Sequence, residues 1–262
     1  MNASLVVRRL RLVGRGWLVH VKHMSSSGVF LVFSLIGPIV FATITFYLFR
    51  AGDQPRTLVY AAIGAGMQAM WTTTLIGSGQ SLTLLRAMGL LELLVAAPVP
   101  LGFVLAPVTL ATATVGLYAL VATLTWGVVL FGIPVHVAHP LLLVVALPVS
   151  VFGLGMVGMV LGSVFVRFRY ANALTNLFDY PIWLLCGLLV PVGLLPAPLR
   201  PLSWLLPPTW GAQAIRDSII GGAPLPAVGV CLALGAGYLG LSLFTVRTFE
   251  RLARNSASLA LT

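Results

Sequence analysis

Charged side chains are scarce in this 262-residue chain. Only 8% of the residues are Asp, Glu, Lys or Arg, whereas 59% are hydrophobic. A soluble domain carries about 25% charged residues, so this chain cannot cover a surface that faces water. A helix needs about 20 apolar residues to cross the hydrocarbon core of a bilayer, and the length allows six such helices with little else. We therefore expect an all-α integral membrane protein without a separate soluble catalytic domain.

Lysine and acidic residues are rarer still. The chain has 15 Lys and Arg residues against 5 Asp and Glu residues, and Lys22 is its single lysine. A P-loop needs the pattern Gly-x-x-x-x-Gly-Lys-Ser/Thr. His23 follows Lys22, so the sequence contains no P-loop that could hydrolyse ATP. Most basic residues lie outside the apolar runs, where they set membrane orientation, and we therefore expect no nucleic-acid partner.

Residues that bind metals or act as nucleophiles form no motif. Two cysteines inside apolar runs indicate buried free thiols. Two histidine pairs at i, i+3 spacing have no Cys or carboxylate nearby to complete a metal site. We expect no metal, no cofactor and no catalytic residue in this chain. The residues concerned are Cys186, Cys231, His20, His23, His136 and His139.

Uncharged runs and their interruptions predict the domain organisation. The longest run, residues 93–166, is too long for one helix, and Gly132, Pro134 and Pro140 divide it into two spans. The predicted spans cover about residues 28–49, 57–85, two segments within 93–166, 171–192 and 225–246. Residues 1–262 thus form one transmembrane domain, with an amphipathic segment at 1–27, six spans within 28–246 and a tail at 247–262.

The N-terminal segment has two faces. Apolar residues at helical spacing lie roughly opposite a stripe of basic residues, as in a helix in the plane of anionic lipid headgroups. We therefore expect an interfacial helix here, with membrane lipids as partners. The apolar face comprises Val6, Leu10, Val13 and Trp17, and the basic stripe comprises Arg8, Arg11, Arg15 and Lys22.

The distribution of basic residues predicts the orientation. With six spans, both termini lie on the same side of the membrane. The termini and the loops on their side hold eleven of the 15 Lys and Arg residues, and the opposite loops hold four. Basic residues are enriched on the cytoplasmic side, so we expect both termini in the cytoplasm.

The connection between the second and third predicted spans is longer and more apolar than a turn requires. Its sequence is RAMGLLELLVAAPVP, residues 86–100. Four apolar residues share one helical face, and two prolines end the helix before the next span. A short amphipathic helix of this kind suits docking into a groove on another protein; the alternative is a helix that only rests on lipid. The apolar face comprises Leu90, Leu91, Leu94 and Val95.

A proline-rich segment precedes the last predicted span. Residues 194–210 are mostly apolar, but five prolines prevent a single spanning helix. Trp204 and Trp210 have amphipathic rings that suit the headgroup level. We expect short re-entrant helices that cap the outer mouth of the protein; the alternative is an interfacial anchor without a gating role.

These two segments together resemble the type-two ABC exporter permeases, the class of daunorubicin and polysaccharide exporters. The resemblance is carried by G-L-L-E-L-L-x-x-x-P-V-P at 89–100 and by LLPAPLRPLSWLLPPTWGAQAIRD at 194–217, and with the six-span order it covers essentially the whole chain. The chain departs from the usual pattern at Leu90, where the family often has Thr, and at Pro207, where Asn commonly precedes the next Pro.

The resemblance implies a membrane subunit that is driven by other chains. It makes the segment from Met88 to Pro98 a cytoplasmic coupling helix, with Glu92 at the family's acidic position. It also implies two ABC ATPase subunits that bind ATP and Mg, a second permease chain, identical or related, and a bacterial cytoplasmic membrane. The implied activity is export of an amphipathic drug, lipid or lipid-linked glycan. The coupling residues are Arg86, Gly89, Leu91, Glu92, Leu94 and Pro98.

Asp179 is the single formal charge inside a predicted span, and it shares a helical face with Asn172 and Asn176. An acid deep in the membrane costs about 2.5 to 3.5 kcal/mol, so it should face protein or water. We expect this face to line the substrate path or the seam between two permeases. The alternative is a span that begins later, which would leave Asp179 near the interface.

Two other classes of membrane protein remain as alternatives. An ion-coupled secondary transporter or a channel would work without an ATPase partner. An intramembrane enzyme would need acids, bases or metal ligands clustered at one depth, and the isolated Asp179 argues against that class.

Overall fold

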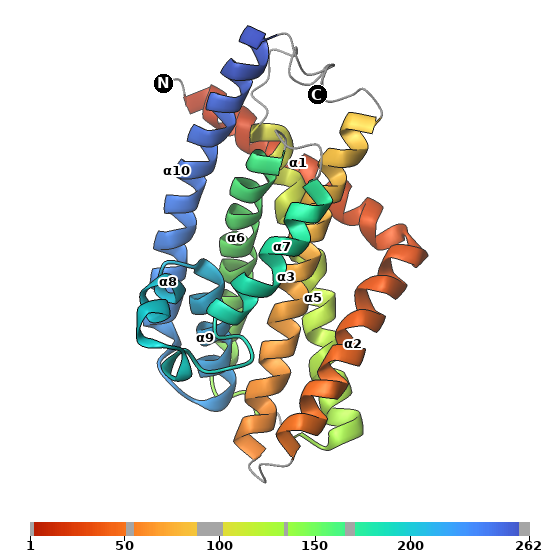
Figure 1. Ribbon diagram of the computed structural model, residues 1–262, viewed down its shortest axis with the longest axis vertical. Helices are drawn as coiled ribbons and strands as arrows, with labels where there is room; N and C mark the ends of the chain where they lie inside the picture. Colours follow the sequence, from red (N-terminus) through yellow and green to blue (C-terminus); the bar gives the residue numbers. More distant parts are fainter. Residues whose placement is uncertain (1–2, 51–54, 88–101, 134–135, 166–170, 257–262) are drawn as a thin grey trace.

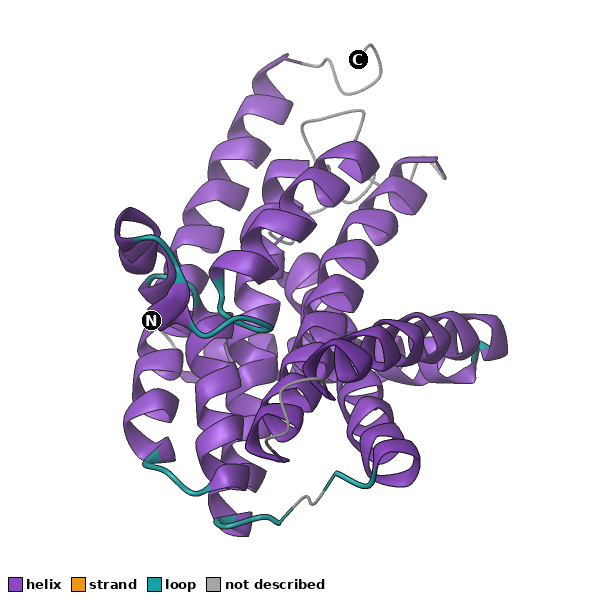
Figure 2. Ribbon diagram, turned by 60° about the horizontal axis from the view of Figure 1, so that its bottom comes forward, coloured by secondary structure: helices purple, strands orange, loops and turns teal. Residues whose placement is uncertain are grey.

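The computed structural model describes residues 3–50, 55–87, 102–133, 136–165 and 171–256 (Figure 1). Every regular element in these ranges is a helix, and short loops join the helices (Figure 2). The all-helical fold is therefore confirmed for the described ranges. The elements are α1 (Ala3–Ser26), α2 (Gly28–Arg50), α3 (Pro55–Ala87), α5 (Gly102–Phe131), α6 (Pro140–Phe165), α7 (Ala171–Leu185), η1 (Val192–Leu194), η2 (Ala197–Leu199), α8 (Arg200–Trp204), α9 (Pro207–Ile220) and α10 (Pro224–Ser256).

Three of the described helices are long and apolar enough to cross a membrane. They cover Gly102–Phe131 in α5, Pro140–Ser163 in α6 and Pro224–Thr248 in α10. In α2 the apolar segment Leu35–Leu48 is shorter, and α7 has only 15 residues. The membrane-protein class is thus confirmed, whereas the count of six spans stays a prediction.

The long uncharged run is interrupted at the residues that the sequence indicates. α5 ends at Phe131 and α6 begins at Pro140. Gly132 has a left-handed φ of 62°, and its amide donates to the Val128 carbonyl at 3.1 Å. A glycine in this conformation is a common helix terminator because it lacks the Cβ that would clash.

The fifth predicted span, in contrast, is longer than the helix that the structure shows there. α7 ends at Leu185, seven residues before the predicted boundary at residue 192. Gly187 turns the chain with a φ of 68°, and its amide donates to the Leu184 carbonyl at 3.3 Å. The glycine therefore ends the helix before the proline-rich segment is reached.

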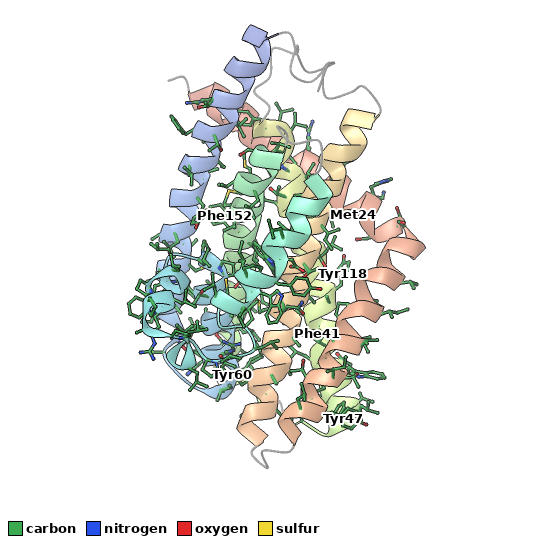
Figure 3. All side chains as sticks on the ribbon, viewed as in Figure 1. Met24, Phe41, Tyr47, Tyr60, Tyr118 and Phe152 are labelled. Atoms are coloured by element: carbon green, nitrogen blue, oxygen red, sulfur yellow. The ribbon has the colours of Figure 1, made fainter. Side chains whose placement is uncertain are left out.

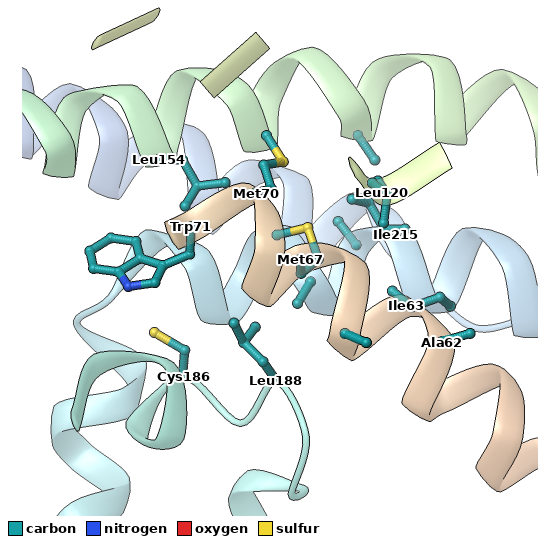
Figure 4. Close-up of a cluster of buried hydrophobic side chains, with 14 of the residues drawn as sticks. Ala62, Ile63, Met67, Met70, Trp71, Leu120, Leu154, Cys186, Leu188 and Ile215 are labelled. Atoms are coloured by element: carbon teal, nitrogen blue, oxygen red, sulfur yellow. The ribbon is translucent and has the colours of Figure 1, made fainter. Parts of the chain in front are cut away.

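α3 lies at the centre of the bundle, with α2, α5, α6 and α7 around it (Figure 1). One buried cluster joins α3 to its neighbours, and Figure 4 shows part of it. In lipid, helices associate through close packing, because lipid tails are as apolar as the side chains. The α3 members of the cluster are Val59, Ala61, Ala62, Ile63, Ala65, Met67, Met70, Trp71 and Leu75.

Two glycines allow α3 and α5 to approach closely. A Cβ at Gly116 of α5 would lie 2.9 Å from Cα and 3.1 Å from the carbonyl oxygen of Met70 in α3. A Cβ at Gly66 of α3 would lie 2.6 Å from the hydroxyl of Thr123. Because backbone cannot move aside as a flexible side chain can, the contact at Gly116 requires glycine.

α1 crosses the bundle at the end where the last described residues of α10 lie (Figure 1). It is held to α5, since the Trp17 indole N–H donates to the Thr114 hydroxyl at 3.0 Å and Ser25 and Tyr118 share a hydrogen bond of 3.2 Å. Burial and the neighbouring His23 lower the pKa of His20. The exposed residues of α1 include Arg11, Leu12, Arg15, Leu18, Val19 and Lys22.

Replacement of Gly116 by Ala should destabilise the protein. The added methyl group meets the backbone of Met70, and overpacking of this kind costs about 1–3 kcal/mol. A lower midpoint of thermal unfolding in detergent would show the effect. Gly237 of α10 provides the matched control, because a Cβ there meets nothing within 4 Å. If Gly237→Ala lowers the midpoint as much as Gly116→Ala, the α3–α5 contact is not the cause.

Candidate functional site

The predicted coupling residues lie largely beyond the described ranges. Arg86 belongs to the last turn of α3, which ends at Ala87. The remaining coupling residues fall outside the described residues, namely Gly89, Leu91, Glu92, Leu94 and Pro98. The structure thus describes the helix that leads into the coupling segment.

α7 carries the predicted polar face, and Asp179 is its best-described member. The side chain is only 9% exposed, and its carboxylate accepts a hydrogen bond from the Thr72 hydroxyl of α3, with oxygen–oxygen distances of 3.0 and 3.4 Å. Because charge-assisted hydrogen bonds are strong in a low dielectric, this pair joins the middle of α7 to the middle of α3.

The sequence does not single out Thr72 as the partner. It stands in a run of three threonines in α3, and the next two, Thr73 and Thr74, donate instead to carbonyls one turn earlier in their own helix. A hydroxyl in an apolar run is therefore a weak signal, because most such groups bond to their own helix backbone.

The side of α7 next to Asp179 is uncovered in the single chain. Leu177 is 64% exposed and Tyr180 is 67% exposed. Trp183, further along α7, packs edge-on against Phe41 of α2 with ring centroids 6.1 Å apart. Asn172 lies on α7 two turns before Asp179, and Asn176 lies one turn before it; the side chains of both asparagines are outside the described part. One side of α7 is thus hydrogen-bonded to α3, and another side is exposed.

A cap follows α7 at the end of the bundle away from α1 (Figure 1). We use this name for η1, η2, α8 and α9, residues 192–220. The Ser203 hydroxyl donates to the Leu185 carbonyl at the end of α7 at 2.6 Å, and the Thr209 hydroxyl donates to the Ser203 carbonyl at 2.7 Å. Side chains within the cap therefore satisfy backbone groups that the proline-interrupted helices leave free.

The two tryptophans of the cap lie together. The Trp210 indole N–H donates to the Trp204 carbonyl at 2.8 Å, and the Trp204 side chain is 55% exposed. The far end of α9 is joined to the loop between α5 and α6, because the amides of Ala138 and His139 donate to the carbonyls of Ile219 and Ser218 at 3.3 and 2.9 Å.

Arg216 of α9 links the cap to α3, and the sequence does not indicate this role. Its guanidinium carbon lies 3.6 Å from the centroid of the Tyr60 ring, and Nη1 donates to the Gly187 carbonyl at 3.1 Å. Nη2 donates to the Leu188 carbonyl. The Tyr60 hydroxyl donates to the same Gly187 carbonyl at 3.0 Å. Figure 3 shows Tyr60 on α3 beside the cap.

Gly64 of α3 allows this contact to form. A Cβ at this position would overlap the Leu188 carbonyl oxygen, so the turn after α7 can lie directly on α3 only because residue 64 is glycine. Within the described ranges, no three His, Cys, Asp or Glu side chains gather where they could hold a metal ion. The polar residues of the candidate site join α3 to α7 and to the cap through hydrogen bonds and a cation–π contact.

The model of the ABC-2 type transporter family matches residues 12–220, which is most of the chain. The chain belongs to this family. Comparison with curated proteins found no match. The matched region begins within α1 and ends with the last residue of α9, so it includes α7, the cap and the segment that resembles the coupling helix.

Membership makes this protein a multi-pass ABC transporter permease, which is a membrane subunit of a kind that associates with ABC ATPases. In the permease, Thr72 and Asp179 join two helices that the matched region contains, and Arg216 lies four residues before its end.

Removal of the Thr72 hydroxyl should destabilise the permease. Thr72→Val keeps the shape of the side chain but removes the hydroxyl that donates to the buried Asp179 carboxylate, and the loss of such a donor costs about 1–3 kcal/mol. The midpoint of thermal unfolding of the purified permease measures the loss. Thr73→Val is the control, since the Thr73 hydroxyl bonds at 2.8 Å to the Ala69 carbonyl of its own helix. Equal midpoints for the two variants would contradict the importance of the α3–α7 bond.

Proposed function

We propose that this permease is the membrane subunit of an ATP-driven exporter in a bacterial cytoplasmic membrane. The observation that carries the proposal is the family match over residues 12–220. The sequence has no P-loop, which leaves another polypeptide or an ion gradient as the energy source. We infer from the family match that separate ATPase subunits supply the energy and that two copies of them bind ATP and Mg. The substrate is amphipathic: a drug, a lipid or a lipid-linked glycan.

In the proposed topology α2, α3, α5, α6, α7 and α10 are the six spans, and both termini are cytoplasmic. The excess of basic residues on the terminal side supports this orientation. The described ends of α1 and α10 lie at one end of the bundle and the cap lies at the other (Figure 1). α1 then lies along the cytoplasmic surface, and the cap with Trp204 and Trp210 lies at the outer surface.

ATP-driven movement would enter the permease through the segment after α3. Arg86, Gly89, Leu91, Glu92, Leu94 and Pro98 are the proposed contacts with the ATPase. A motor shifts its partner only through contacts that differ between its ATP-bound and ATP-free states. α3 has 33 residues, about 50 Å at 1.5 Å per residue, so it can connect such contacts to the cap end.

The substrate would pass between two permease chains, identical or related. The face of α7 with Asn172, Asn176 and Asp179 is the proposed lining of this path or seam. The bare side of α7, with Leu177 and Tyr180 exposed, supports a second chain or a substrate as its neighbour.

Glu92→Ala should lower substrate-stimulated ATP hydrolysis several-fold, because the ATPase would lose a contact through which it moves the permease. Membrane insertion should stay unchanged, since Glu92 lies outside the predicted spans. The measurement is ATP hydrolysis by the permease–ATPase complex in reconstituted vesicles. Glu250→Ala is the control, an acidic residue near the end of α10 on the same proposed side.

Two outcomes would count against the proposal. Unchanged stimulation in Glu92→Ala would remove the role of that residue. Transport by the wild-type permease alone, driven by an ion gradient, would replace the ATP-driven exporter with the ion-coupled alternative.

The orientation can be tested by labelling single cysteines. In a background with Cys186→Ser and Cys231→Ser, Gly52→Cys should react with an impermeant maleimide added to intact cells, because residue 52 follows the first span. Ser258→Cys should react only after the cells are permeabilised. The reverse pattern would place the coupling segment outside the cell, where no ATPase could reach it.

A further inference from the structure

Arg216 is a cation in a cap helix whose neighbours are mostly buried and apolar. Ala212, Ala214 and Ile215 are fully buried, and so is Ser218. Arginine keeps its charge under all ordinary conditions, so the guanidinium needs partners within the protein. The partners that the structure gives it are the two carbonyls of Gly187 and Leu188 and the face of Tyr60.

These partners come from two different parts of the bundle, the turn after α7 and the helix α3. Gly187 and Leu188 form the first turn after α7, whereas Tyr60 belongs to α3. Because the Tyr60 hydroxyl and Arg216 donate to the same carbonyl, losing either donor weakens the hold of α3 and the cap on this turn. Together with the Thr72–Asp179 bond, they attach α7 to α3 at two points, one at its middle and one at its cap end.

The attachment at the cap end of α7, which Arg216 makes, also contains an unsatisfied hydrogen-bond donor. Nε of Arg216 is buried and has no hydrogen-bond partner in the described part of the chain. A buried donor without an acceptor is costly, so the closed arrangement is less stable than a fully satisfied one would be. The contacts that Arg216 makes with the two carbonyls and with the Tyr60 ring can also be replaced by contacts with water.

We propose that Arg216, Tyr60 and the Gly187–Leu188 turn form a latch that holds the cap end of α7 against α3 and opens when substrate leaves on the cap side. The inference rests on the proposed function, because it assigns the latch a step in export. Arg216 acts here as a positioning residue: it fixes the turn after α7 and needs no contact with the substrate.

The chain contains both a reporter and a matched control for this latch. Cys186 directly precedes the turn, and its side chain is 1% exposed, so its thiol is shielded while the latch is closed. Arg200 is also an arginine of the cap that donates to two carbonyls, those of Leu195 and Gly193 at 3.0 and 2.7 Å. It is exposed, and both of its acceptors lie within seven residues of it in sequence.

The experiment measures the rate at which a maleimide labels Cys186 in the permease–ATPase complex in vesicles, with Cys231→Ser removing the other thiol. Without nucleotide, Arg216→Gln should label several-fold faster than the parent, whereas Arg200→Gln should label at the parent rate. Tyr60→Phe, which keeps the ring and loses the hydroxyl, should fall between them. In the parent complex, labelling should accelerate during ATP hydrolysis, which a purely structural contact would not show.

Two results would overturn the latch. One is equal labelling of the parent and Arg216→Gln without nucleotide. The other is labelling of the parent that ATP hydrolysis and transport leave unchanged. If Arg216→Gln does not fold, as judged by size-exclusion profile and thermal midpoint, Arg216→Lys and Tyr60→Phe give the same comparison.

Failure of the proposed function would be visible separately. A complex that neither hydrolyses ATP nor transports would contradict the exporter, and the nucleotide-free rates would still decide whether Arg216 shields Cys186.

Discussion

The contacts that α3 makes along its length with α7 and the cap are the constraint on which the rest of the structure depends. Near its start, Tyr60 and Gly64 receive the turn after α7 and Arg216 of the cap. At its middle, Thr72 holds Asp179. At its far end, the helix leads into the segment that resembles a coupling helix. One continuous helix of 33 residues therefore carries Tyr60, Gly64 and Thr72 at fixed spacing, so the cap and α7 are both held by the same element.

The bilayer explains why these few polar contacts matter. Apolar side chains gain little by meeting one another in lipid, so the helices are held by close approach at small residues such as Gly66 and Gly116 and by polar pairs. The polar pairs are directional and each has a defined partner, so each can be broken as a discrete event. Apolar packing along α3 supplies the rest of the cohesion.

Much of the fold could be predicted from the sequence, because helix ends depend on local chemistry. Gly132 and Pro140 divide the longest uncharged run at the place where the structure divides it. α7 ends earlier than the sequence predicts because Gly187 adopts a left-handed backbone conformation, which composition does not reveal. Asp179 stood out as a lone acid in an apolar run. Thr72 and Arg216 carry no comparable signal in the sequence, because their importance lies in partners that are far away in sequence.

The attachment of α9 to the loop between α5 and α6 gives the cap a fixed edge. Two backbone hydrogen bonds from Ala138 and His139 secure its last carbonyls, and neither involves a side chain that could be repelled or exchanged. α9 also packs against α6 and α10. If the contacts with α3 open, these attachments hold the far side of the cap in place, and we expect the cap to rotate with its largest displacement on the side of α7.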